Sequence, residues 1–163
     1  MGLRVQCSLF LLSGLMGAQL WAGANFPTAP DPQLTPGALC QTADEYRYPE
    51  KVAYCDRNVS TDGKWYVISN YMKKYNFAIT DSNREDFKID HYIPLCMGGG
   101  NTYDNLWPQH KSVYTISDPY EVVLCQKLAA GRITQQQAIE KMKYGKQNYK
   151  LIPALIKEAS KLK

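Results

Sequence analysis

The stretch from Phe87 to Gln109, FKIDHYIPLCMGGGNTYDNLWPQ, carries most of the information about the fold of this chain. It begins with strand-like residues that bring an acid and a histidine side by side, Asp90 and His91. The glycines Gly98 to Gly100 then favour a turn, and a second apolar run opens on Asn105. The pattern predicts two short strands joined as a hairpin.

This stretch resembles the motif of the ββα-metal (HNH) nucleases, in the secreted branch with the pattern DHxIPLxxGGxNxxxNLWPQ. The matching residues are Asp90, His91, Ile93, Pro94, Leu95, Gly98, Gly99, Asn101, Asn105, Leu106, Trp107, Pro108 and Gln109. The resemblance covers roughly residues 87–145. It implies an α+β fold with a ββα-metal (His-Me finger) core at residues 87–131, formed by a two-stranded hairpin plus helix with additional helices around it.

His91 is the candidate general base. Its ordinary pKa near ~6.5 lets it accept a proton from water at neutral pH. Strand alternation would point Asp90 and His91 to opposite faces, but the resemblance implies a backbone bend that lets Asp90 hold a metal ion. Asn105 is the second candidate catalytic residue. The resemblance implies that it ties the loop between the strands and so holds the backbone of His91.

Oxygen and nitrogen ligands of this kind suit a hard divalent cation, so Mg²⁺ is expected, with Mn²⁺ or Ca²⁺ as alternatives. Many HNH enzymes place a His or Asn about nine residues after the middle Asn, where this chain has Tyr114, a poor ligand. We therefore expect His110 to be the second metal ligand or a phosphate contact. Gln109 and Asp118 remain alternatives.

Three side chains are candidate substrate contacts: Arg84, Gln109 and Lys111. A guanidinium near the metal, such as that of Arg84, can clamp a phosphate group. The chain differs from the family at Ser117, where the family often has a lysine. The role of that lysine is therefore not assigned to Ser117.

The cysteines predict two disulfides. Cys7 lies in a predicted signal peptide, which leaves four cysteines with three possible pairings. Our preferred pairing is Cys40 with Cys55 and Cys96 with Cys125. A four-cysteine zinc site is the alternative, but the chain lacks the CxxC spacing typical of one.

The chain is expected to be exported as one domain. Residues 1–24 have the basic start, apolar middle and small-residue cleavage site of a signal peptide, and the apolar stretch is short for a membrane span. Residues 25–38 are predicted to be an extended, proline-rich leader, and residues 39–163 a single nuclease domain. We expect a monomer that is secreted or periplasmic, with no membrane contact after cleavage.

Local patterns predict helices beyond the hairpin. Lys64–Tyr75 carries an apolar and aromatic stripe at helical spacing, which favours core packing over base stacking. Asp118 is predicted to be the N-cap of a helix from Pro119 to about Ala130. Gly131 would stop that helix. A third helix is predicted from Thr134, the first residue of a capping box, to about Gln147. A fourth is predicted from Leu151 to Leu162.

Charge is unevenly distributed along the chain. The segment from Lys127 onward has nine Lys or Arg against two acids, whereas Asn25 to Gln126 has nine against thirteen. This basic end either contacts a polyanion or is a solvated helix surface.

Taken with the motif, these features predict a secreted, metal-dependent endonuclease that hydrolyses phosphodiester bonds of DNA, or of RNA, largely without sequence preference. The alternative is a non-catalytic exported module on the same fold that binds nucleic acid or metal.

Overall fold

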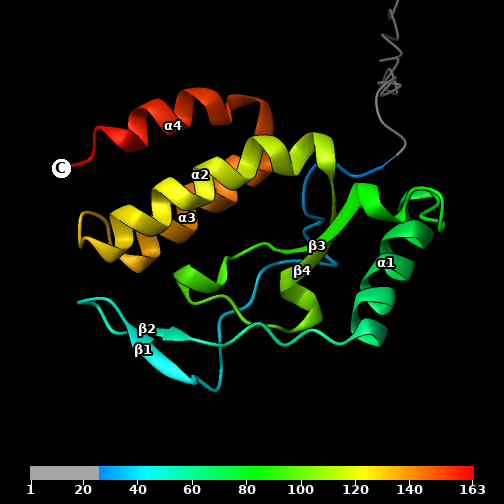
Figure 1. The fold of residues 1–163 in the computed structure, drawn as a ribbon, viewed down its shortest axis with the longest axis horizontal. Coiled ribbons are helices and arrows are strands. Elements are labelled where there is room, and N and C mark those ends of the chain that lie inside the picture. The colour runs from blue at the N-terminus through cyan, green and yellow to red at the C-terminus, as the bar shows by residue number, and fades with distance from the viewer. Residues whose placement is uncertain (1–25) are drawn as a thin grey trace, which may run out of the picture.

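The computed structural model describes residues 26–163, so the predicted signal peptide and its Cys7 lie outside the described residues. This part of the chain has an α+β fold with two small antiparallel hairpins and four helices (Figure 1). The elements are β1 (Glu45–Arg47), β2 (Val52–Tyr54), α1 (Thr61–Tyr75), β3 (Phe87–His91), β4 (Leu106–His110), α2 (Lys111–Ala129), α3 (Gln135–Gln147) and α4 (Ile152–Ser160).

The predicted hairpin is formed by β3 and β4, which pair antiparallel with Phe87 opposite His110 and His91 opposite Leu106. Its loop folds back closely at Gly99, where an added Cβ would lie 1.7 Å from the carbonyl oxygen of Ile93. Only glycine fits that approach. The chain passes from β4 directly into α2, so the order of elements is strand, strand, helix.

Helices cover the hairpin from both sides, with α1 on one side and the layer of α2, α3 and α4 on the other (Figure 1). Each side has its own core. The α1 side is built around Ile68, Tyr71, Leu106, Trp107 and Val113. The side of the other three helices is built around Leu124, Leu128, Met142 and Ile152.

Helix α2 begins earlier than the capping signature predicted, and this corrects the assignment of Asp118 as a cap. The helix starts at Lys111, capped by the His110 ring, and Pro119 lies inside it. A cap contributes about 1 kcal/mol, whereas burial of an apolar side chain contributes roughly 1.5–3 kcal/mol. Val113 is fully buried, so tertiary packing extends the helix toward β4.

The other helix predictions are confirmed with small changes. Thr134 forms the expected capping box with Gln137 at the start of α3. In α1 the stripe is narrower than predicted, because Trp65 and Tyr75 are 39% and 42% exposed while Ile68 and Tyr71 are buried.

The proline-rich segment after residue 25 has no helix or strand, but it packs as part of the domain. Asp31 is buried and accepts hydrogen bonds from two backbone amides, from Lys74 and from Tyr75. Thr35 donates to the carbonyl oxygen of Leu106 at 2.8 Å. The segment therefore packs against α1 and β4, a role that its sequence did not reveal.

Both predicted disulfides are present, Cys40 with Cys55 and Cys96 with Cys125. The first links the chain before β1 to the chain after β2, and the second links the hairpin loop to α2. Disulfides of this kind are typical of an oxidising, extracellular compartment. Within the described residues, no helix is both long enough and apolar enough to span a membrane.

Reducing the disulfides is expected to lower the melting temperature by on the order of 10 °C, because each closed loop contributes roughly 3 kcal/mol. Thermal unfolding followed by circular dichroism, with and without dithiothreitol, measures the effect. Dithiothreitol should leave the melting temperature of a variant with all four cysteines replaced by serine unchanged. An unchanged melting temperature in the reduced wild type would contradict the expectation.

Candidate functional site

Asp90 lies on β3 and is 5% exposed. One carboxylate oxygen accepts a hydrogen bond from the Lys146 ammonium at 2.6 Å, and the other lies 3.2 Å from the Lys88 ammonium. Burial alone would raise the pKa of Asp90, but the two ammonium groups outweigh it and hold that pKa below its usual range. Asp90 is therefore a buried carboxylate with a cation on each oxygen.

Lys146 comes from α3 and has no exposed side-chain surface. Besides Asp90, its ammonium donates to the backbone carbonyl oxygen of His91 and lies 3.6 Å from a carboxylate oxygen of Glu121 on α2. Three oxygens thus surround one nitrogen. Such a buried charge is tolerated because it is paired and hydrogen-bonded.

His91 is 2% exposed, and its two ring nitrogens have different surroundings. Nε2 lies 3.0 Å from Oδ1 of Asn101, whose amide group donates to the carbonyl oxygen of Asp56. Because that second bond fixes the orientation of the Asn101 amide, Nε2 of His91 is assigned as the protonated nitrogen. Nδ1 is then the basic nitrogen, and it is buried without a hydrogen-bond partner among the described residues.

Burial lowers the pKa of His91 to about 4, and the charge of Arg57 acts in the same direction, while the bond to Asn101 opposes it. The imidazole is consequently neutral at pH 7. A neutral imidazole with one free nitrogen can accept a proton.

Asn105 holds the chain that leaves β3. Its side-chain amide donates to the carbonyl oxygens of Ile93 at 3.0 Å and Gly100 at 2.8 Å, and its side-chain oxygen accepts from the Ile93 amide at 2.9 Å. The residue is fully buried. These bonds join the two ends of the loop and set the backbone just beyond His91.

The bend that the resemblance implied between Asp90 and His91 is not seen in the strand pairing. Asp90 pairs with Trp107 and His91 with Leu106 in an uninterrupted register. The two side chains accordingly reach different parts of the molecule, Asp90 toward α3 and His91 toward Asn101, as strand alternation requires.

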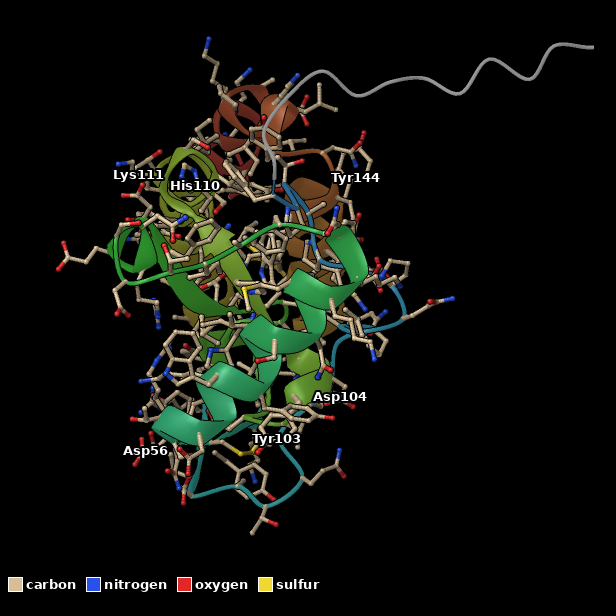
Figure 2. The ribbon with its side chains drawn as sticks, turned by 90° about the vertical axis from the view of Figure 1, so that its right-hand side faces the viewer. Asp56, Tyr103, Asp104, His110, Lys111 and Tyr144 are labelled. Carbon is tan, nitrogen blue, oxygen red and sulfur yellow. A yellow bond between two sulfur atoms is a disulfide. The ribbon has the colours of Figure 1, made fainter. Side chains whose placement is uncertain are left out.

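His110 does not join Asp90. Three residues separate them along the hairpin register, which corresponds to about 10 Å. The His110 ring caps α2 and stacks on Phe26 with a centroid distance of 3.9 Å. Figure 2 shows His110 and Lys111 near one end of the molecule and Asp56, which is joined to His91 through Asn101, near the other.

Two of the remaining predicted contacts, Lys111 and Arg84, lie at the His110 end of the hairpin, away from Asp90. Lys111 pairs with Asp86 at 2.8 Å, and Arg84 donates to the carbonyl oxygen of Phe87. Gln109 is fully buried and donates to the Ser117 hydroxyl at 2.8 Å. The structure therefore does not assemble these residues around Asp90.

A divalent cation does not fit the carboxylate of Asp90 as it stands, because both of its oxygens already face ammonium groups. The expected second ligand, His110, lies elsewhere. Among residues 26–163, the group of potential ligands that comes close enough for a metal is Cys96, Glu121 and Cys125, and its two cysteines are joined in a disulfide.

Four residues of the site were not expected from the sequence: Lys146, Lys88, Glu121 and Arg57. Asn101 was one of the motif residues, but no role was predicted for it. The alternation of β3 could have placed Lys88 on the same face as Asp90, two residues away. Lys146 lies four residues after Met142, so helical periodicity places it on the buried face of α3. It was not predicted to be buried because a lysine side chain is ordinarily exposed to solvent.

Fold and site together define a small, disulfide-bonded α+β protein. Adjacent positions of β3 hold Asp90, which is paired with the buried Lys146, and His91, which is buried and neutral. Comparison with known proteins gives no match: no protein-family model, no curated protein and no solved structure matches this chain.

Proposed function

We propose that this protein is an exported endonuclease of the HNH type that hydrolyses phosphodiester bonds of DNA or RNA, with His91 as general base. The observation that carries the proposal is the state of the His91 ring, with Nε2 held by Asn101 and Nδ1 free to accept a proton. The strand, strand, helix order and the loop held by Asn105 support an HNH core. The two disulfides support export.

In the proposed reaction, Nδ1 of His91 takes a proton from a water molecule whose oxygen attacks the phosphorus. A new bond forms between that oxygen and phosphorus, the bond to the leaving sugar oxygen breaks, and the leaving oxygen takes a proton from solvent. His91 then returns its proton to solvent. Asn101 orients the ring, and the exposed Arg57 near it supplies positive charge on the side where an anionic chain would approach.

The second candidate is a non-catalytic exported module that binds nucleic acid on the same fold. Two observations favour it: the Asp90 carboxylate is already neutralised by lysines, and the His91 side chain is only 2% exposed. Nδ1 is itself buried, so substrate would have to displace the groups that cover it. Activity measurements separate the two candidates.

The test is cleavage of supercoiled plasmid and of single-stranded RNA by the purified protein. His91→Gln is expected to lower the rate by roughly 100-fold or more, the loss expected for a positioned general base. The rate of the wild type should be flat from about pH 5 to pH 8 and fall as pH drops through about 4, because the active form is the neutral imidazole and burial lowers the pKa of His91 to about 4.

His110→Gln is the matched control, since it makes the same change at the other histidine of the chain. Its rate should stay within about threefold of wild type, because His110 lies at the far end of the hairpin. Equal rates for His91→Gln and wild type would rule out the general base. Binding of the nucleic acid without any cleavage would establish the second candidate.

A further inference from the structure

We propose that the Lys146 ammonium is a built-in counter-ion of Asp90 that takes the place of a divalent cation, so that the site forms and acts without bound metal. That Asp90 binds Lys146 in place of a divalent cation is inferred from geometry alone. That the site acts without bound metal rests on the proposed function.

The Lys146 nitrogen lies 2.6 Å from one Asp90 oxygen and also contacts the His91 carbonyl oxygen, with a Glu121 oxygen at 3.6 Å. A Mg²⁺ ion bound to that Asp90 oxygen would sit about 2.1 Å from it and require several further oxygens in an octahedron. Ion and ammonium would compete for the same oxygens, so both cannot be held there.

Asp90 already faces two positive charges, the ammonium groups of Lys146 and Lys88. A divalent cation at Asp90 would add a further positive charge beside them. Because Asp90 and Lys146 are buried, the added charge would lack the solvation that water provides.

Lys146 is held in place by the close approach of α3 to α2. Gly145, the residue before it, lies so close to α2 that an added Cβ would come within 2.7 Å of the Tyr120 ring. The absence of a side chain at Gly145 therefore allows α3 to approach α2. This approach brings Lys146 to Asp90 as a fixed group with no solvent-exposed surface.

Lys146 is accordingly a positioning residue. It is fully buried, and it acts on His91 through the backbone carbonyl oxygen while the imidazole extends toward Asn101. The same ammonium thus neutralises Asp90 and fixes the backbone of the proposed general base.

The test is a Mn²⁺ titration of the full chain followed by electron paramagnetic resonance, together with melting curves in EDTA and in Mn²⁺. The wild type is expected to show no Mn²⁺ site tighter than about 1 mM, the weak end of extracellular cation sites. Its melting temperature should be the same in EDTA and in Mn²⁺. Lys146→Gln removes the internal cation and is expected to gain a Mn²⁺ site that is lost again in Lys146→Gln/Asp90→Asn.

A Mn²⁺ site in the wild type that disappears in Asp90→Asn would overturn this proposal, and that result needs no folded Lys146 variant. Plasmid cleavage at an equal rate in EDTA and in Mg²⁺ would support the activity statement. Cleavage in Mg²⁺ but not in EDTA would overturn it. Absence of cleavage of both plasmid and single-stranded RNA under both conditions would refute the proposed nuclease, while the Mn²⁺ titration would still decide whether Lys146 replaces the metal.

Discussion

Replacing Lys146 by methionine is expected to lower the free energy of unfolding by about 3–5 kcal/mol, the cost of removing one partner from a buried ion pair. Methionine keeps most of the length of the side chain but leaves Asp90 buried without its closest cation. Lys88 remains 3.2 Å from the other oxygen of Asp90, which limits the loss. Urea denaturation with linear extrapolation measures the change.

Lys141→Met is the matched control, because Lys141 is an exposed lysine on the same helix. Its effect should be within about 0.5 kcal/mol. Adding Asp90→Asn to Lys146→Met should recover part of the lost stability, since the uncompensated charge is then removed as well. A loss below about 1 kcal/mol for Lys146→Met would contradict the buried pair.

Replacing Asn105 by alanine is expected to lower the free energy of unfolding by at least about 3 kcal/mol. The change leaves the Ile93 amide and the carbonyl oxygens of Ile93 and Gly100 without their side-chain partner. Each buried polar group left unpaired costs about 1–3 kcal/mol. Urea denaturation gives the total, and faster hydrogen exchange at the Ile93 amide would locate the damage in the hairpin loop.

Asn148→Ala is the control for that experiment. The Asn148 side chain makes one exposed hydrogen bond, to the carbonyl oxygen of Tyr144, so its removal should cost less than about 1 kcal/mol. If Asn105→Ala were no more damaging than Asn148→Ala, the loop would not depend on the Asn105 side chain.

Several elements could be predicted because their signals are local. The glycine-rich turn between two strand-like runs predicted the hairpin of β3 and β4. The capping box of Thr134 and Gln137 predicted the start of α3. Two disulfides were expected from four cysteines in an exported chain, and the preferred one of the three possible pairings is the one observed. In the hairpin and in α3, the residues that decide the structure lie close together in the sequence.

The start of α2 and the place of His110 could not be predicted in the same way. Asp118 and Pro119 form a valid capping signature, but burial of Val113 outweighs it and the helix runs on toward β4. His110 follows the motif directly in the sequence. In the strand register it nevertheless lies opposite Phe87, away from Asp90, so closeness in sequence did not bring it to the site.

The sequence by itself determined the hairpin, most of the helices and the two disulfides, because periodicity, capping residues, glycines and cysteine spacing act over short distances. Only the tertiary structure decided what Asp90 binds. Its partner Lys146 lies 56 positions away, on the face of α3 that also buries Ala138 and Met142, and only the folded chain places a carboxylate opposite that face. The packing of α3 against α2 turns that one lysine inward, where the buried carboxylate supplies the opposite charge.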